Sequence, residues 1–212
     1  MKVFYIVGKS SVGKDTIYKI LKNKLDVKPY VLYTTRPIRT GEENGIDYNY
    51  LTKDEMEKYI NKPELKVIEY RTYNTVYGPW TYATILDKQF EGEKDLLMEG
   101  TLESYNSIKK YFEKNIKVNV IPIYIEVDDG IRLERALKRE MQQEKPKYEE
   151  LCRRFLADSK DFSEEKIIES GINKRFKNID MNTCVDEIIN YIEKQWKQKN
   201  FKEKMRYILT KQ

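Results

Sequence analysis

The chain has 212 residues, of which 40% are hydrophobic and 35% charged, and its formal net charge is +5. This composition is typical of one folded globular domain, and the small positive charge suits anionic ligands without indicating nucleic acid. Histidine is absent and the only cysteines are Cys152 and Cys184, which excludes His-dependent triads, imidazole zinc sites and a disulfide scaffold. Neither a secretory pattern nor a run of ~20 apolar residues is present, so we expect a cytoplasmic protein.

Short apolar runs alternate with helical patterns along most of the chain. Three runs predict buried parallel strands, at residues 2–7, 95–98 and 120–127. Four patterns predict helices, at residues 13–24, 102–112, 131–141 and about 183–196. Strands that alternate with helices predict an α/β fold with a parallel central sheet.

Two segments interrupt this alternation. Residues 36–80 are rich in Tyr, Thr and charge and contain hairpin-like strands at 66–73 and 76–78, which predicts a small inserted subdomain. Residues 139–160 are charged, with a turn-like stretch at 142–147 between two helices, which predicts a mobile lid. We therefore expect a single domain over 1–212. Its parts are a core at 1–35, 81–130 and 161–212, an insert at 36–80 and a lid at about 131–160. The lysine-rich tail from Lys197 is expected to be a solvated helix.

The sharpest motif follows the first predicted strand directly. Residues 8–16 read GKSSVGKDT, which contains the G-x-x-x-x-G-K spacing of a phosphate-binding loop. Its glycines let backbone N–H groups face phosphates, the following helix adds its positive N-terminal end, and the lysine supplies a cation. We predict that ATP phosphates bind at Gly8, Ser10, Ser11, Val12, Gly13, Lys14, Asp15 and Thr16.

The residue after Lys14 departs from the usual pattern, which has Ser or Thr at that position to bind Mg²⁺. Here it is Asp15, with Thr16 next. A carboxylate is a hard oxygen ligand that can bind Mg²⁺, but a helix N-terminus favours an acidic residue even without a metal. Both interpretations of Asp15 stay open at the level of sequence.

A second cluster of chemically interesting residues reads YTTRPIRTGEENGIDY at positions 33–48. Arg36 and Arg39 lie three residues apart with tyrosines nearby, so two guanidinium groups and a phenol can clamp one phosphate dianion. Paired arginines alone are usually surface charges. In a chain that also has a phosphate loop, they indicate a second phosphate site.

At this point the sequence resembles the guanylate kinase family, whose acceptor motif reads T-T-R-x-x-R-x-G-E-x-x-G-x-D-Y and is matched in register from Thr34 to Tyr48. Ile68-Glu69-Tyr70 and Tyr77-Gly78 look like the family's base-binding glutamate and its tyrosine-glycine pair, with a loop one residue shorter. The stretch 95–99 resembles the family strand that ends in an acidic residue near the metal.

The resemblance runs from about residue 2 to residue 196 and implies a three-layer P-loop fold, with an inserted acceptor subdomain and a helical lid. It implies catalytic roles for Lys14, Arg139 and Arg154 and an ATP contact for Arg135. The acceptor contacts that it implies are Thr35, Arg36, Arg39, Tyr48, Glu69, Tyr77, Gly78 and Thr101. The metal ligands that it implies are Asp15 and Glu99.

The departures from the family pattern gather where the acceptor's base would bind. Family members usually carry a serine where this chain has Leu32, Ser or Thr where it has Pro79, and a second aspartate where it has Thr101. The phosphate-holding positions are kept. Phosphoryl transfer is therefore better supported than the identity of the base.

The lid arginines and the two key glutamates also have plainer interpretations. Arg154 has Glu150 and Asp158 four residues away and could simply form surface ion pairs. Arg135 and Arg139 have no acidic neighbour at helical spacing, and their like charges on one face favour an anion-binding role. Glu69 could be a surface residue of a strand, and Glu99 a structural carboxylate.

We therefore expect an ATP- and Mg²⁺-dependent kinase that phosphorylates a nucleoside monophosphate, most simply GMP. Such transfer needs alignment and charge neutralisation rather than a histidine base. The alternatives are a kinase of the same fold that acts on another nucleotide or a sugar phosphate, and a non-catalytic guanylate-kinase-like binding module. The expected partners are small-molecule nucleotides, with no nucleic acid, membrane or obligatory protein partner.

Overall fold

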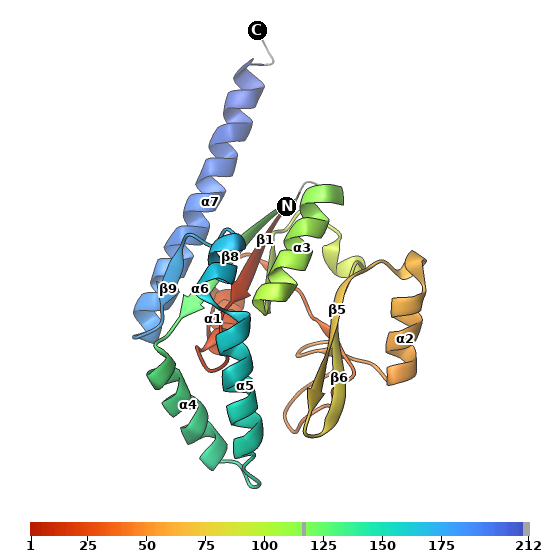
Figure 1. Cartoon of the computed structure of the whole chain (residues 1–212). Coiled ribbons are helices and arrows are strands. Elements are labelled where there is room, and N and C mark those ends of the chain that lie inside the picture. Colours follow the sequence, from red (N-terminus) through yellow and green to blue (C-terminus); the bar gives the residue numbers. More distant parts are fainter. Residues whose placement is uncertain (116–117, 210–212) are drawn as a thin grey trace.

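The computed structural model describes residues 1–115 and 118–209, and the side chains up to residue 197 other than that of Pro63. Its central sheet is parallel, in the order β2-β7-β1-β8-β9, which confirms the predicted fold class (Figure 1). The strands of this sheet are β1 (Lys2–Val7), β2 (Lys28–Pro29), β7 (Leu96–Gly100), β8 (Asn119–Glu126) and β9 (Arg175–Lys177).

The helices follow the predicted positions closely. They are α1 (Lys14–Lys24), α2 (Lys53–Asn61), α3 (Leu102–Asn115), α4 (Asp129–Met141), α5 (Tyr148–Asp161), α6 (Glu164–Glu169) and α7 (Met181–Leu209), with short 3-10 helices η1 (Pro63–Leu65) and η2 (Lys88–Phe90). The last helix is longer than the predicted 183–196, because helix-forming Lys, Gln and Glu continue beyond the amphipathic stretch. The expected solvation of the tail concerns side chains from residue 198 on, which lie outside the described ones.

Helices cover both faces of the central sheet, so the core has three layers. On β1, Val3, Tyr5 and Val7 pack with side chains of α3 and α6, whereas Phe4 and Ile6 pack with side chains of α1 and α7. All five are fully buried, which explains the uninterrupted apolar run in the sequence. Burial of each such side chain contributes about 1.5–3 kcal/mol.

A second, antiparallel-rich sheet lies beside the core in the order β4-β3-β6-β5. Its strands are β3 (Tyr33–Thr34), β4 (Asn49–Tyr50), β5 (Val67–Thr75) and β6 (Gly78–Ile85), so it extends slightly beyond the expected insert at both ends. The predicted strand at 76–78 was wrong. Val76 and Tyr77 form the hairpin turn, because Gly78 takes a φ of 103° and the Thr75 hydroxyl accepts the Tyr77 N–H.

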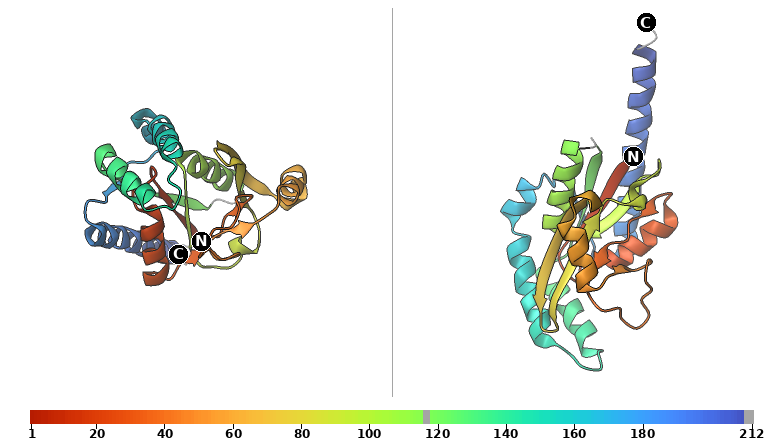
Figure 2. Two further views of the ribbon diagram at one scale, coloured as in Figure 1. Left: turned by 90° about the horizontal axis from the view of Figure 1, so that it is seen from below. Right: turned by 90° about the vertical axis from the view of Figure 1, so that its right-hand side faces the viewer.

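The second sheet and the lid flank the same end of the central sheet. Figures 1 and 2 place β5, β6 and α2 on one side of this end and the helices α4 and α5 on the other. The helix α4 begins after Asp128, whose carboxylate accepts the N–H groups of Gly130 and Ile131. Within the described part of the chain, no helix combines the length and apolarity needed to cross a membrane.

Candidate active site

The loop between β1 and α1 has the geometry that its glycines require. A Cβ on Gly8 would lie 2.6 Å from the carbonyl oxygen of Ile125 on β8. Gly13 has a φ of +92°, and a Cβ there would lie 2.7 Å from the side-chain nitrogen of Asn178. Ser11 also has a positive φ, of 65°. The loop is therefore tightly folded against the strand ends, as expected for a phosphate cradle.

Lys14 folds back over the loop from the first turn of α1. Its Nζ donates to the carbonyl oxygens of Gly8, at 2.7 Å, and Lys9, at 3.0 Å. Burial lowers the pKa of Lys14, although the charges of Asp15 and Glu99 oppose this effect. The ammonium group is thus placed at the loop, where it can meet a phosphate as a point charge.

Two residues that sequence reasoning missed hold the loop from distant parts of the chain. Asn178, which is 1% exposed, donates its side-chain N–H to the carbonyl oxygen of Val12 at 2.8 Å. Asp158 of α5 accepts the backbone N–H of Ser10 at 2.8 Å. Neither lies in a motif, and no local pattern links them to the loop.

Arg132, also missed, supports Asp158 from α4. It is 1% exposed, its Nη1 lies 3.1 Å from the Asp158 carboxylate, and its Nε donates to Asp129 at 2.9 Å. Its guanidinium stacks at 4.1 Å over the ring of Phe155, and its Nη2 has no hydrogen-bond partner among the described residues. The two lid helices therefore meet the phosphate loop through a buried ion pair.

Glu99 is a partly buried carboxylate near the end of β7. Burial raises its pKa to about 7, and the neighbouring negative charge of Asp15 adds to this shift. Its Oε2 is buried and has no hydrogen-bond partner among the described residues. A buried carboxylate oxygen with no donor, beside a second carboxylate, suits a hard divalent cation.

These two carboxylates fit the way proteins usually bind Mg²⁺, which is through one or two carboxylates together with substrate phosphates and water. Among the described residues there is no group of three or more Asp, Glu, Cys or His side chains that could hold a metal without a substrate. Thr16, next to Asp15, is exposed in the first turn of α1. The donor set therefore matches a metal that arrives with the nucleotide.

On the acceptor side, Arg36 is buried and held in place. Its Nη2 lies 2.8 Å from the Glu42 carboxylate, and its guanidinium lies 5.1 Å from the ring centre of Tyr48. The hydrogen bond from Arg36 lowers the pKa of Glu42 to about 2, with further help from the Tyr50 hydroxyl. This network fixes the arginine before any ligand binds.

The other predicted acceptor residues have different surroundings. The Arg39 side chain is exposed, and its backbone N–H donates to Glu42 at 2.9 Å. Thr35 joins β3 to β6, because its hydroxyl accepts the Thr81 N–H at 2.9 Å. Tyr77, followed by Gly78, is 59% exposed at the hairpin tip and stacks on Trp80 with ring centres 5.6 Å apart.

Tyr48 connects the acceptor cluster to the carboxylates of the donor side. Burial raises its pKa, and the negative charges of Glu99 and Asp15 raise it further, while Arg36 acts in the opposite direction. These charges act on the phenol only because the second sheet faces the end of the central sheet. The two predicted phosphate sites thus face one another.

The lid arginines reach the phosphate loop. Arg139 donates to the Ser11 hydroxyl at 3.2 Å and Arg154 to the Ser10 hydroxyl at 3.5 Å. Arg135 donates to the carbonyl oxygen of Asn178 at 3.1 Å.

The plainer interpretation of Arg154, as one half of a surface ion pair, fails. Glu150 pairs with Arg153 at 2.7 Å, and Asp158 pairs with Arg132 at 3.1 Å. Arg154 is directed to the phosphate loop instead.

The lid also touches the tip of the β5–β6 hairpin. The backbone N–H of Val76 lies near enough to the Glu150 carboxylate to help lower its pKa, and the Lys147 ammonium lies 5.9 Å from the ring centre of Tyr77. The helices α4 and α5 therefore contact both the phosphate loop and the acceptor hairpin.

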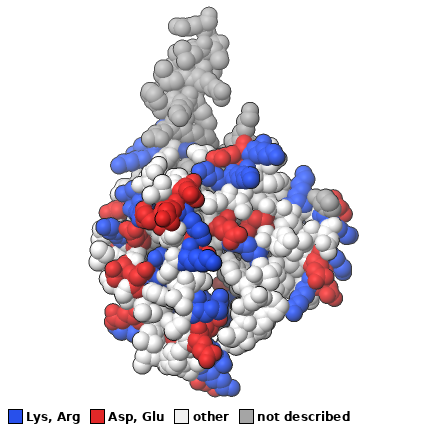
Figure 3. All heavy atoms as spheres, viewed as in Figure 1, with Lys and Arg blue, Asp and Glu red and all other residues white. Residues whose placement is uncertain are grey.

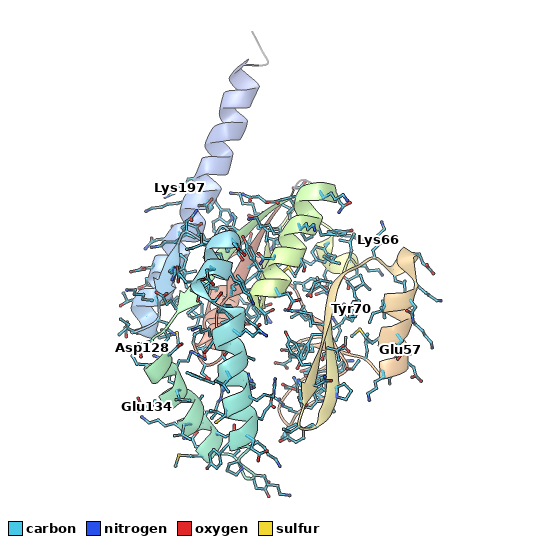
Figure 4. The ribbon with its side chains drawn as sticks, in the orientation of Figure 1. Glu57, Lys66, Tyr70, Asp128, Glu134 and Lys197 are labelled. Carbon is cyan, nitrogen blue, oxygen red and sulfur yellow. The ribbon has the colours of Figure 1, made fainter. Side chains whose placement is uncertain are left out.

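Glu69 is not a surface residue, since its side chain is 7% exposed. Its Oε1 accepts hydroxyl hydrogen bonds from Ser104, at 2.6 Å, and Thr84, at 3.1 Å, and its Oε2 lies 3.2 Å from the Nε of Arg71. Arg71 also donates to the hydroxyl of Thr101. Tyr70, which lies between Glu69 and Arg71 on β5, is labelled in Figure 4 and marks this part of the strand.

The charged residues around these elements are mixed in sign. On the face seen in Figure 3, Lys and Arg alternate with Asp and Glu, and no broad single-sign patch covers this side. Because this face is not uniformly basic, any attraction of phosphate to the candidate site depends on where the individual arginines lie.

The sequence matches the guanylate kinase family over residues 1–195. A guanylate kinase of Oceanobacillus iheyensis is 31% identical over 122 residues, which cover 57% of this chain and 57% of that protein. That of Clostridioides difficile is 32% identical over 123 residues, which cover 57% and 58%. The chain thus spans less than two thirds of the length of these relatives.

The crystal structure of guanylate kinase from Anaplasma phagocytophilum is also similar, with a TM-score of 0.59. The alignment covers 92% of this chain and 86% of that one, at 19% identity. At this identity the likeness shows the fold, which agrees with the expected P-loop architecture. Because the family match extends over nearly the whole chain, this chain belongs to the guanylate kinase family.

Proposed function

We propose that this protein transfers the γ-phosphoryl group of ATP to GMP, forming ADP and GDP. The observation that carries the proposal is the position of Tyr48. Its ring centre lies 5.1 Å from the buried guanidinium of Arg36, and the phenol is near enough to Asp15 and Glu99 for their charges to raise its pKa. A phosphate held at Arg36 would therefore face a nucleotide held at the loop. Family membership supports the same reaction.

On the donor side, the loop N–H groups and Lys14 would bind the ATP phosphates. Asp15 and Glu99 would hold Mg²⁺, which would neutralise charge on the transferred group. The pKa of Glu99, raised to about 7, fits a carboxylate whose ionised form needs a cation beside it.

On the acceptor side, Arg36 and Tyr48 would bind the phosphate of GMP, with Arg39 completing the clamp. The acceptor phosphate oxygen is already ionised, so no general base is required. Arg139 and Arg154 lie at the loop, where they would spread the charge of the transferred phosphoryl group and exclude water.

We also propose small-molecule nucleotides as the protein's ligands and the cytoplasm as its location. Both cysteines are free thiols, with Cys152 exposed and Cys184 buried, which fits a reducing compartment.

The test is an assay of ADP release with ATP and Mg²⁺ fixed and GMP, dGMP, AMP, UMP, CMP, dTMP and sugar phosphates as acceptors. We expect GMP to give the highest kcat/KM. Lys14→Ala should abolish turnover, whereas Lys22→Ala, an exposed change on the same helix, should not. Turnover of a sugar phosphate but not of GMP would refute the proposal. Nucleotide binding without any ADP release would indicate a binding module instead.

A further inference from the structure

Arg71 occupies the region where the acceptor's base is expected to bind. It lies on β5 with Glu69 and Tyr73, and residues two apart on a strand share a face. Its side chain is 15% exposed and bridges the Glu69 carboxylate and the hydroxyl of Thr101. The two bridged residues are both expected to contact the acceptor, yet neither sequence motif included the arginine between them.

The Glu69 carboxylate is already engaged on both oxygens. Ser104 and Thr84 donate to Oε1, and Arg71 lies against Oε2. Tyr5, whose hydroxyl is buried without a hydrogen-bond partner among the described residues, lies close enough for the charges of Glu69 and Arg71 to act on it. The base region is therefore a preformed polar network, in which Ser104 and Thr84 donate to Glu69 and the arginine adds an ion contact at 3.2 Å, while its buried Nε has no hydrogen-bond partner among the described residues.

A guanine base offers an acceptor, O6, beside the N1–H and N2–H donors that suit a carboxylate. Leu32 and Pro79 provide no hydroxyl that could donate to O6. An arginine beside the carboxylate that binds N1–H lies at the right place to fill this gap, because its planar fork can contact a carboxylate and a carbonyl oxygen together.

We propose that Arg71 is a specificity-determining residue, whose guanidinium donates to the exocyclic oxygen at C6 of the acceptor purine while Glu69 accepts from N1–H. This inference depends on the proposed function, since it takes the acceptor to be a nucleoside monophosphate. The preferred class is a 6-oxopurine nucleotide, with the 2-amino group contributing less than the oxygen.

The proposal separates four purine monophosphates by their base edges. GMP and IMP carry the C6 oxygen and N1–H, whereas 2-aminopurine ribonucleoside monophosphate has the 2-amino group without that oxygen, and AMP has neither the oxygen nor N1–H. The loss of a hydrogen bond to a charged group corresponds to about a 10- to 100-fold loss in affinity.

The experiment measures equilibrium binding of the four nucleotides by calorimetry, so that it does not depend on turnover. Arg71→Met should lower the affinity for GMP and for IMP about 10-fold or more, and change the affinity for the 2-aminopurine nucleotide less than about threefold. Arg71→Lys keeps a charge opposite Glu69 and should fold. It should still lower the affinity for GMP and IMP at least about threefold, because one ammonium group cannot contact Glu69, Thr101 and the C6 oxygen together.

Lys66→Met is the matched control, because Lys66, labelled in Figure 4, is exposed just before β5 and its substitution should leave all four affinities unchanged. An equal loss for all four nucleotides would overturn the proposal and show a structural role. A gain for GMP on Arg71→Met would overturn it by showing that the arginine blocks the site. Wild-type protein that binds GMP without turnover would refute the proposed function, and a selective loss of GMP and IMP affinity in Arg71→Met would still support the role of Arg71.

Discussion

The buried pair between Arg132 and Asp158 gives a quantitative test of how the lid is joined to the phosphate loop. In Asp158→Ala, the 1% exposed guanidinium of Arg132 keeps one ion partner among the described residues, Asp129, a carboxylate that is 48% exposed, and a long hydrogen bond of 3.4 Å to the carbonyl oxygen of Ser10. Removing one partner of a buried pair costs about 3–5 kcal/mol, and the remaining partner reduces this. The Ser10 N–H also loses its acceptor, which adds about 1–3 kcal/mol if it stays buried.

We therefore expect Asp158→Ala to lower the free energy of unfolding by about 3 kcal/mol, which corresponds to a fall in Tm of about 6–12 °C for a domain of this size. Arg132→Met should cost less, about 1–2 kcal/mol, because it removes the buried charge and leaves the Asp158 contact to Ser10 in place. The double variant should then be at least about 1 kcal/mol more stable than the sum of the single effects predicts.

The measurement is urea unfolding of all four proteins without nucleotide, analysed as a double-mutant cycle. Asp161→Ala is the control, since Asp161 is 59% exposed and the one ion partner that it has among the described side chains, Lys166, is 3.9 Å away. It should change stability by less than about 0.5 kcal/mol. Additivity of the two single variants within about 0.5 kcal/mol would show that the pair does not join the lid to the loop.

Three further outcomes are expected. Glu42→Gln should destabilise the protein by about 2–3 kcal/mol at pH 7. A carboxyl pKa lowered to about 2 stabilises the fold above its ordinary value near 4.5, and this is lost as the pH falls toward 2. Parallel stability curves of wild type and variant between pH 4.5 and 2 would contradict it. Arg36→Ala should raise the KM for the acceptor much more than the KM for ATP, which initial-rate kinetics measures. Equal increases in the two KM values would show that Arg36 does not act in the acceptor site. Asp15→Asn and Glu99→Gln should each raise the Mg²⁺ concentration needed for half-maximal rate, and unchanged titrations would remove these residues from the metal site.

The features that the sequence predicted well depend on residues that are consecutive in the chain. The phosphate loop follows from glycine spacing and its place between a strand and a helix, and the structure shows why Gly8 and Gly13 are needed there. The parallel sheet followed from uninterrupted apolar runs such as residues 2–7. Glu42 was within a recognised motif, although its part in holding Arg36 became clear only from the 2.8 Å contact.

The features that sequence could not predict depend on contacts between distant segments. Asp158 and Ser10 are 148 positions apart, and Asn178 and Val12 are 166 apart. A lone Asp on a charged helix or an Asn after a short strand carries no local sign of such a contact. Arg71 had a weak signal, since it shares a strand face with Glu69, but only the fold brings Thr101 beside it.

The position of Glu99 shows how the fold turns separate segments into one site. The parallel register pairs Ile6 of β1 with Glu99 of β7, and Val7 with Tyr124 of β8, so the three strands end at the same edge. The phosphate loop and the lid helix α4 follow the ends of β1 and β8, and Glu99 is the next-to-last residue of β7, at the edge where parallel sheets generally bind ligands.

The second sheet is inserted between β2 and β7, so both of its connections to the core return to neighbouring strands. This topology is consistent with Tyr48, and Arg36 beside it, lying near enough to the strand edge for the charge of Glu99 to act on the phenol. It leaves the base region, at Arg71 and Thr101, to be formed jointly by the insert and the start of α3. If the proposed function holds, we expect substitutions in that region to change which base is accepted without disturbing the groups proposed to align the phosphates.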